Sequence, residues 1–507
     1  MSDGRASHEV MSTSELIRRG LDKSRTQPTA LVLAVVCVAQ FMVVLDISIV
    51  NVALPDMRRT LHMSQNSLAW VLNAYTLTFA GFLLLGGRAA DIWGRKRLFL
   101  AGVVLFSLTS LLGGFAQSGG QLIAARALQG LGGAVLSPAT LTILTTTFAD
   151  PKARTRALGA WSATAAAGGA TGVLLGGVLT DLLSWRWILF INVPIGIAVF
   201  IVARFAVAES KLEGDRPSLD WAGALTITGG LVALVYGIVS TDKHAWGSTF
   251  VVSYMVAGVA LIAAFLVIES RHRHPLVPLR LFRSRGVTGA NLIMIVLGSV
   301  MFSLFFFLSQ YMQDVRGYSP LRTGVAFLPL PVAIIIGTQI STRLVQRVGT
   351  RTLLTIGPLV SAGGVLLLSR LHENSSYLNI GLGGAITTFG VGMSFVPITL
   401  SATGGVAPQD AGLASGLINT TRQIGGSLGL AVLLTIATSR RNHVASFGQR
   451  YAETAGYTRA FEVGSLFLVG AAVIAALVLP ALTRPQSQPE PEPEIELEMS
   501  SAEPALD

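Results

Sequence analysis

The sequence has little charge and almost no cysteine, and both shortages exclude whole classes of protein. Only 13% of its 507 residues are charged, whereas soluble domains carry about 25%. The single cysteine, Cys37, allows neither a disulfide framework nor a thiolate metal site. All seven histidines lie outside the long apolar segments, which argues against a histidine proton relay. The sequence contains no G-x-x-x-x-G-K-[ST] loop, which excludes a nucleotide-driven pump built on that motif.

What the sequence has in abundance is apolar residues in long segments. Hydrophobic residues make up 51% of the chain. They fall into blocks of about 19 to 25 residues, the length that a helix needs to cross roughly 30 Å of hydrocarbon. We therefore predict an all-α membrane protein with fourteen transmembrane helices. The predicted spans are 30–51, 67–86, 98–116, 121–147, 157–180, 187–208, 219–240, 250–268, 286–312, 321–342, 351–369, 377–402, 411–437 and 460–483.

The basic residues lie mainly in the short loops between apolar blocks, a pattern of membrane topology rather than of nucleic acid binding. With a cytoplasmic N-terminus, the inner segments hold 24 of the 37 Lys and Arg residues and the outer segments hold 11. This excess predicts that both termini are cytoplasmic. The arginine-heavy, alanine-rich composition favours a high-GC bacterium and hence the plasma membrane. One loop departs from this excess of basic residues on the inner side. It places four arginines outside in this topology: Arg440, Arg441, Arg450 and Arg459.

Two loops of similar sequence indicate an internal repeat. Between the second and third spans the chain reads GRAADIWGRKR, and between the tenth and eleventh it reads TRLVQRVGTR. Gln346 and Gly349 in the second loop have the same spacing as Asp91 and Gly94 in the first, so the second resembles a decayed copy. Duplicated bundles that rock about a midplane site are a transporter architecture.

The repeat divides the chain into two six-helix bundles with two helices inserted between them. The first bundle is predicted over residues 30–208, the inserted helices with their linkers over 209–285, and the second bundle over 286–483. Residues 1–29 are predicted to form a cytoplasmic tail. The segment 484–507 alternates Pro and Glu, which cannot bury a core, so we predict a disordered acidic tail.

Several segments carry motifs that belong together. The first span contains LDISIVNVALP from Leu45, and the fourth contains LIAARALQG from Leu122. WRW begins at Trp185, NVP at Asn192, and NTTRQIGG at Asn419. With the GRAADIWGRKR loop, they resemble the major facilitator superfamily, and within it the fourteen-helix drug:proton antiporters of the EmrB/QacA type. The resemblance implies the major facilitator fold and proton-driven antiport.

Asp46 is the only carboxylate well inside any predicted span. A charge at mid-bilayer costs roughly 2.5 to 3.5 kcal/mol on insertion scales, so it needs a partner or a task. Asp46 and Arg126 each lie about five residues, or roughly 7 Å, below the outer surface. In the family that the chain resembles, both of their spans line the central cavity, which supports a pair.

Burial disfavours the charged form of a carboxyl group, and a nearby arginine favours it. A site balanced in this way can change its proton occupancy as it alternates between two aqueous faces. We predict that Asp46 carries the coupling proton and that Arg126 is its partner. The alternative is a static ion pair that holds two helices together.

The loop between the second and third spans gathers Gly87, Asp91, Gly94, Arg95 and Lys96. Its two glycines let the backbone pass close to a neighbouring helix. The resemblance implies an inner-gate latch that favours the outward-facing state. The plain alternative is a basic loop that only sets topology. Because the second copy of the loop lacks the acid, a latch is expected in one half only.

The fifth span carries glycines that match the exporters' glycine motif, although Val173 stands where that family usually has proline. The helix is therefore expected to be less kinked. Small residues four apart lie on one helix face and let another helix approach closely. We predict that this face is the sliding seam between the bundles; the alternative is tight packing alone. The glycines are Gly159, Gly168, Gly172, Gly176 and Gly177.

Several further side chains within predicted spans are candidates to line a cavity, although each taken singly fits helix packing as well. Arg422 lies near the middle of the thirteenth span without an evident acidic partner. Three contacts stay open for it: a cavity, backbone carbonyls, or a carboxylate such as Asp46. The candidates are Asn73, Tyr75, Asn291, Gln310, Thr387, Met393 and Arg422.

These features predict a proton-driven exporter that needs no cofactor or metal and is not an enzyme. A cavity with one acid and few fixed charges suits small hydrophobic drugs or antibiotics, cationic or amphiphilic in character. We expect a monomer in the bilayer whose partners are its substrate and protons. Two alternatives remain: a symporter of the same fold that imports a metabolite, and a membrane receptor or assembly factor. Asp46, Arg126 and Asp91 together argue against the last.

Overall fold

The computed structural model describes residues 29–210, 218–407 and 410–480, and every regular element among them is a helix. The predicted tails over residues 1–29 and 484–507 lie outside this range, apart from Thr29, which begins the first helix. The elements are α2 (Thr29–Thr60), α3 (Gln65–Trp93), α4 (Arg95–Gly114), α5 (Gly119–Thr147), α6 (Pro151–Leu182), α7 (Trp187–Phe190), α8 (Asn192–Ala206), α9 (Trp221–Ser240), α10 (Thr249–Arg271), η1 (Leu279–Arg283), α11 (Arg285–Gln310), η2 (Tyr311–Val315), α12 (Pro320–Phe327), α13 (Pro329–Leu368), α14 (Tyr377–Thr403), α15 (Ala411–His443), η4 (Ala445–Phe447) and α16 (Gln449–Val478).

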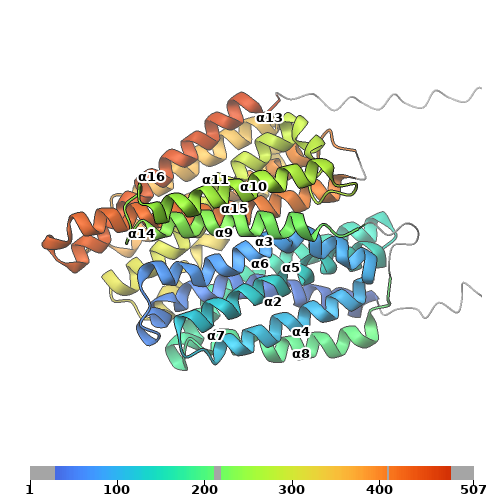
Figure 1. Ribbon diagram of the computed structural model, residues 1–507, viewed down its shortest axis with the longest axis horizontal. Coiled ribbons are helices and arrows are strands. Elements are labelled where there is room, and N and C mark those ends of the chain that lie inside the picture. The colour runs from blue at the N-terminus through green and yellow to red at the C-terminus, as the bar shows by residue number, and fades with distance from the viewer. Residues whose placement is uncertain (1–28, 211–217, 408–409, 481–507) are drawn as a thin grey trace, which may run out of the picture.

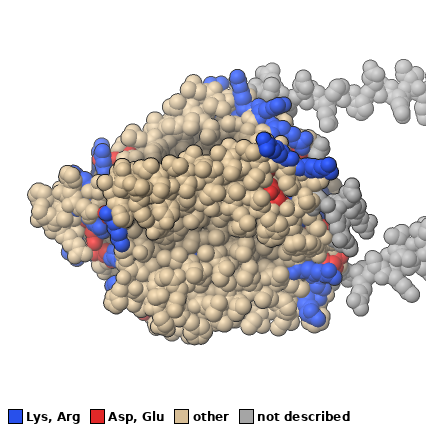
Figure 2. All heavy atoms as spheres, viewed as in Figure 1, with Lys and Arg blue, Asp and Glu red and all other residues tan. Residues whose placement is uncertain are grey.

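The long helices form a membrane-spanning body. Twelve of the described helices are long and apolar enough to cross a bilayer. On the face shown in Figure 2, charged side chains gather at the two ends of the molecule, and the belt between them is almost uncharged. Such a belt meets lipid without the cost of burying charge. The prediction of an all-α membrane protein is therefore confirmed.

The predicted number of fourteen spans is not settled by this count. α15 is 33 residues long but is not among the twelve. The segment Pro320–Leu368 counts as one candidate, although the backbone at Gly349 is not helical and interrupts α13. Fourteen results only if α15 is added and α13 is divided at Gly349, so the number stays a prediction.

Polar caps explain where many of these helices begin. In each case a serine or aspartate side chain accepts a hydrogen bond from the backbone N–H three residues further on, which satisfies a donor that the helix leaves free. Between apolar runs, these residues therefore mark the helix starts. The caps are Ser64, Ser118, Asp150, Asp220, Ser248, Ser284 and Ser319.

Two glycines with left-handed backbone occupy matching places in the two loops of the predicted repeat. Gly94 separates α3 from α4 with φ of 109°, and Gly349 breaks α13 with φ of 82°. A side chain is strained at these angles, so glycine is what lets two helices meet at a sharp corner. Matching corners are what an internal duplication predicts.

The helices form two bundles, with α9 and α10 between them (Figure 1). Helices α2 to α8 make the first half, drawn in blue to light green, and α11 to α16 make the second, drawn in yellow-green to red. α9 packs against α3 of the first half and α15 of the second. The inserted pair thus closes one side of the seam between the halves.

The two ends of the molecule are named here for the residues that they carry. The Asp91 end holds the junction of α3 and α4, and the described chain begins and stops there, at Thr29 and Pro480 (Figure 1). The Asp314 end holds η2 and the turn between α2 and α3. Chain ends on one side fit an even number of crossings.

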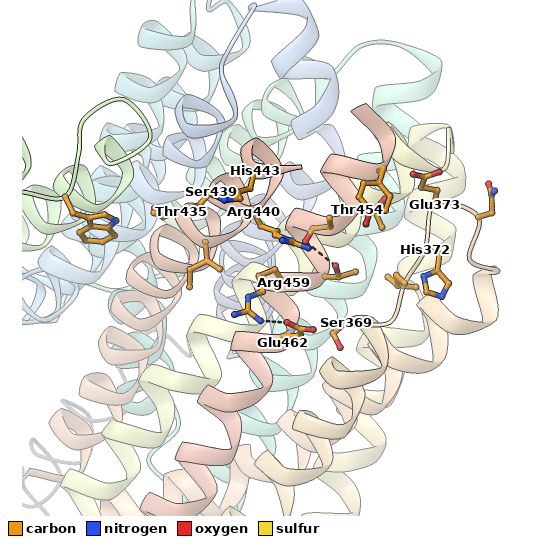
Figure 3. A pocket seen from close by; sticks show the side chains of 17 residues that line it. Ser369, His372, Glu373, Thr435, Ser439, Arg440, His443, Thr454, Arg459 and Glu462 are labelled. Atoms are coloured by element: carbon orange, nitrogen blue, oxygen red, sulfur yellow. Dashed lines mark hydrogen bonds and ion pairs between the residues drawn. The ribbon is translucent and has the colours of Figure 1, made fainter. Parts of the chain in front are cut away.

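At the Asp314 end, the last helix begins earlier than the sequence predicts. α16 starts at Gln449 rather than near residue 460. The basic residues that dissent from the predicted topology therefore stand on helical extensions of α15 and α16 beyond the apolar belt. Two of them, Arg440 and Arg459, border a hollow of about 1000 Å³ with the loop after α13, and Arg459 pairs there with Glu462 at 2.6 Å (Figure 3).

Candidate functional site

A cavity of about 1520 Å³ lies between the two halves. Helices α2, α3, α5 and α6 line it from the first half, and α11, α13, α14 and α15 from the second. Its walls are mostly apolar and include Trp161, Phe302 and Phe305. It reaches the surface at the Asp91 end, where the lining residue Arg280 has a side chain that is 65% exposed.

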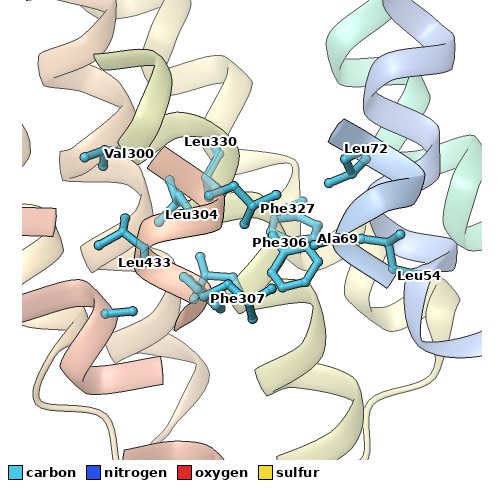
Figure 4. Close-up of a cluster of buried hydrophobic side chains, with 14 of the residues drawn as sticks. Leu54, Ala69, Leu72, Val300, Leu304, Phe306, Phe307, Phe327, Leu330 and Leu433 are labelled. Atoms are coloured by element: carbon cyan, nitrogen blue, oxygen red, sulfur yellow. The ribbon is translucent and has the colours of Figure 1, made fainter. Parts of the chain in front are cut away.

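The Asp314 end is closed by apolar packing across the two halves. Figure 4 shows Leu54 and Ala69 of the first half facing Phe306 and Phe327 of the second. All four side chains are fully buried. Packing of this density leaves no water path, so the cavity is open at one end of the molecule and sealed at the other.

A polar layer joins the halves beside this apolar seal. Arg58 of α2 forms an ion pair with Asp314 of η2 at 2.9 Å, and both side chains are mostly buried. Gln65 of α3 accepts a hydrogen bond from Arg58 at 2.6 Å and donates one to Gln310 of α11 at 2.5 Å. Because the ion pair and the Gln65–Gln310 bond cross from one half to the other, both must break before this end can open.

Asp46 lies at the centre of a buried network in the first half. Arg126 of α5 donates to one carboxylate oxygen of Asp46 at 2.6 Å, and the two side chains are 1% and 0% exposed. Gln129 and Asn192 donate to the other oxygen at 2.8 and 3.0 Å. Arg126 also donates to Gln129 at 2.7 Å and lies over the ring of Tyr75, 4.4 Å from its centroid.

The hydrogen bonds to Asp46 suit one form of a carboxyl group better than the other. A charged carboxylate only accepts hydrogen bonds, whereas the protonated acid also needs an acceptor for its own O–H. The three described neighbours that bond to Asp46 are all donors, an arrangement that a carboxylate can satisfy in full. One nearby acceptor has no hydrogen-bond partner: Oδ1 of Asn192, which is buried. Rotation of the Asn192 amide gives a protonated Asp46 an acceptor.

The Asp46 carboxylate does not itself line the cavity in this conformation. Arg126 and Tyr75 do, and they stand between Asp46 and the open space. Gln129 and Asn192 were not among the candidates from sequence. Gln129 lies three residues after Arg126, hence on the same helix face, and Asn192 is a polar residue in an apolar span. Both signals are present in the sequence but do not identify a partner.

At the Asp91 end, the predicted latch residues make local contacts. Arg95 donates twice to Asp91, at 2.8 and 3.0 Å. Glu209, after α8, accepts the backbone N–H of Lys96 at 3.1 Å, and a Cβ on Gly94 would lie 2.6 Å from the Glu209 carboxylate. Asp91 lines the cavity and forms no ion pair with the second half in the described part of the chain. A latch that joins the halves is therefore not engaged in this conformation.

The mouth of the cavity is crossed by the linker between α10 and α11. Arg88 of α3 donates to the backbone oxygens of His274 and Pro275, at 2.6 and 3.0 Å. Arg280 pairs with Asp410, just before α15, at 3.0 Å. Gly87 also lines this region, and α5 passes close to it. The linker is thus attached to both halves.

The glycine series of α6 does not lie wholly on the seam between the halves. A Cβ on Gly168, Gly172 or Gly176 would meet the backbone of α2, in the same half. Only Gly177 faces the second half, where a Cβ would lie 2.6 Å from the backbone oxygen of Pro320, and Gly159 faces the cavity with nothing within 4 Å. The prediction of a sliding seam is wrong for the three middle glycines, which allow tight packing instead.

We expect Gly176→Ala to destabilise the protein by about 1 to 3 kcal/mol through overpacking. The new Cβ would lie 2.6 Å from the backbone oxygen of Ile49, which a rigid helix cannot move aside. Gly169→Ala is the matched control, because nothing lies within 4 Å of its Cβ. Thermal unfolding in detergent should rank Gly176→Ala well below this control. Equal unfolding temperatures would contradict the packing described.

Of the remaining candidates, only Tyr75 and Arg422 line the cavity. Four of the others form hydrogen bonds within the helix packing, two of them across the two halves, and Met393 is buried among apolar side chains. None of these five lines the cavity in this conformation, which favours the helix-packing alternative. Asn73 accepts from Ser427, Asn291 accepts from Thr421, Gln310 accepts from Gln65, Thr387 donates to the Gly383 oxygen, and Met393 packs with Val345 and Leu353.

Residues 36–430 match the Major Facilitator Superfamily. The chain is 45% identical to a cephamycin export protein, CmcT, from Amycolatopsis lactamdurans, over 91% of this chain and 94% of that protein. It is 40% identical to the puromycin resistance protein pur8 of Streptomyces alboniger, over 88% and 90% of the two chains. A tetracenomycin C resistance and export protein from Streptomyces glaucescens is 33% identical, over 85% and 79%.

Solved structures show the same fold at lower identity. A bacterial homologue of the human lysosomal transporter Spinster, in an inward-facing and unoccupied conformation, has a TM-score of 0.62 and 17% identity, covering 90% of this chain and 97% of that one. The POT family transporter PepTSo has a TM-score of 0.65 and 14% identity, covering 88% and 97%. The predicted fold class is confirmed.

Proposed function

This chain belongs to the major facilitator superfamily, and we propose that it exports small amphiphilic molecules in exchange for protons. The observation that carries the proposal is the fully buried Asp46, bound by three donors behind the wall of a large apolar cavity. A buried carboxylate with one partner that faces the cavity suits a group that changes proton occupancy during a cycle. Relatives named for antibiotic export or resistance support the direction of transport.

The excess of basic residues supports a cytoplasmic Asp91 end and a plasma-membrane location. In this orientation the cavity opens inward, and the three donors around Asp46 correspond to a state that has released its proton to the cytoplasm. Substrate enters from the same side. After the halves rock, a proton from outside binds an Asp46 oxygen, Arg126 loses its charged partner, and Asn192 accepts the new O–H. The site then returns inward with Asp46 protonated.

Asp91 and Arg95 are proposed to act at the opposite moment. When the Asp91 end closes, the Asp91 carboxylate is free to leave Arg95 and meet the second half, which stabilises the outward-facing state. Gly87, Gly94 and Lys96 shape the corner from which it does so. The polar layer of Arg58, Asp314, Gln65 and Gln310 seals the other end while the cavity faces inward.

Inside-out membrane vesicles test the direction and the energy source together. An acidic vesicle interior should drive accumulation of an exported compound, because protons then leave as the compound enters. A first panel follows the names of the relatives: a cephamycin, puromycin and tetracenomycin C, with neutral and cationic dyes added. Loss of compound from acidified vesicles would instead indicate symport, and no flux for any compound would sink the transport proposal.

A further inference from the structure

The inner part of the cavity carries an unbalanced positive charge. Of the five arginines that line the cavity, Arg88, Arg273 and Arg280 lie at its mouth, and Arg126 and Arg422 lie deeper, on α5 and α15. The charge of Arg126 is neutralised by Asp46 at 2.6 Å. Arg422, on α15, forms no ion pair and no side-chain hydrogen bond with any described residue, and its Nε is buried without a partner. Arg422 is therefore a cation of the inner wall without a carboxylate partner in the described part of the chain.

The two arginines differ in how their donors are used. Arg126 donates to Asp46, Gln129 and the backbone oxygen of Val71. Arg422 has the same five N–H donors and uses none of them within the described chain. A buried cation without a partner is costly, so it persists where water or a ligand supplies acceptors. The cavity is the space from which acceptors can reach Arg422.

Other unpaired groups near Arg422 are also donors. Nε2 of Gln423, the next residue on α15, is buried without an acceptor, and so is the hydroxyl of Tyr75 on α3. Both residues line the same cavity. α3 and α15 meet at this level, since Ser427, one turn beyond Gln423, donates to Asn73 at 2.9 Å. Residues that carry a buried donor without an acceptor thus line the cavity from both halves.

From this charge balance we infer that Arg422 binds an acidic group of the transported molecule. The inference rests on the proposed export function and specifies its substrate class: an amphiphilic acid whose anionic group meets Arg422 and whose apolar part meets Phe302 and Phe305. The cationic substrate expected from sequence is disfavoured, because an unpaired arginine repels a cation in a low-dielectric cavity. The sequence alone left the partner of Arg422 open, so it could not show that Asp46 pairs with Arg126 and leaves Arg422 without an acid.

Three fluorescent probes with one apolar scaffold separate charge from shape: dansylglycine is anionic, dansylglycinamide is neutral and dansylethylenediamine is cationic. Binding to the purified full-length protein is followed by dansyl fluorescence. We expect dansylglycine to bind about 10- to 100-fold more tightly than the amide, the range for a hydrogen bond to a charged group. Arg422→Gln should remove this preference and change amide affinity less than about threefold.

Two further variants make the outcome decisive. Arg422→Lys keeps the charge and should retain part of the preference for the acid. Arg347→Gln removes a cation from an exposed position of the same half and should change nothing. Equal binding of the acid and the amide to wild-type protein would overturn the inference, as would an equal loss for all three probes in Arg422→Gln.

The binding assay is separate from the transport assay. Selective binding of dansylglycine without flux in vesicles would leave the Arg422 site standing and refute the export function. Flux of neutral or cationic compounds, without selective binding of dansylglycine, would support transport and refute the acid-binding role of Arg422. If Arg422 serves instead as a second counter-ion for Asp46, Arg422→Gln will alter the pH dependence of binding for all probes alike, and this result also contradicts the inference.

Discussion

Replacing Asp46 with asparagine is expected to abolish uphill transport. Asparagine keeps the size of the side chain but cannot release or bind the proton. In reconstituted vesicles with an imposed pH difference alone, accumulation of substrate should fall by at least about 100-fold, to the level of vesicles without protein. The variant has no group at this site that can couple proton movement to substrate movement. The fold itself should survive, since a neutral side chain at this place corresponds to the protonated state of the cycle.

The matched control is Asp56→Asn. Asp56 makes an ion pair with Arg59 within α2 near the Asp314 end, and Arg59 is 62% exposed, so its loss should cost little. Transport by this variant should stay within about twofold of wild type, as for a surface pair. If Asp46→Asn still accumulates substrate against its gradient under a pH difference alone, Asp46 is a static member of an ion pair and the coupling role is wrong.

Removing the ion pair at the Asp314 end should shift the protein towards its outward-open shape. Arg58 and Asp314 join the two halves, and their side chains are 21% and 12% exposed. A fully buried pair costs 3 to 5 kcal/mol to break by removing one partner; with partial exposure we expect about 1 to 2 kcal/mol for Asp314→Asn. The outward-open population should rise about 5- to 30-fold.

Distance measurement between spin labels gives this population directly. The only native cysteine, Cys37, is buried in α2 and can be replaced first. Labels at the exposed positions Thr60 and Arg370 lie on opposite halves at the Asp314 end. The distance distribution should broaden to longer values in Asp314→Asn and stay unchanged in Arg459→Gln, which breaks an exposed pair within α16. An unchanged distribution in both would show that the apolar seal alone holds this end.

The Asp46–Arg126 pair could be predicted because depth in a membrane constrains side chains strongly. The two side chains meet although α2 continues to Thr60 rather than ending near residue 51. Apolar length marks where a helix enters lipid, but a cap or a turn decides where it ends. For the same reason α16 starts at Gln449, well before the apolar run that predicts the span.

Neighbours across helices were harder to predict than depth. The glycines of α6 show a face for close approach, but which helix approaches depends on the arrangement of the whole bundle, and α2 occupies most of that face. Polar residues such as Asn73 and Asn291 accept hydrogen bonds from a serine and a threonine on another helix. Arg422 is distinguished from them only once its surroundings are known to contain no acceptor.

The proposed antiport requires Asp46 to exchange a proton as substrate binds. A measurement of proton release on substrate binding detects this exchange directly. Purified protein in weakly buffered detergent solution is mixed with a transported compound over a series of pH values, and the proton uptake or release is recorded. We expect a release of up to about one proton per protein within the pH series, and no release from Asp46→Asn. Absence of release in the wild type at every pH, or an equal release in the variant, would contradict it.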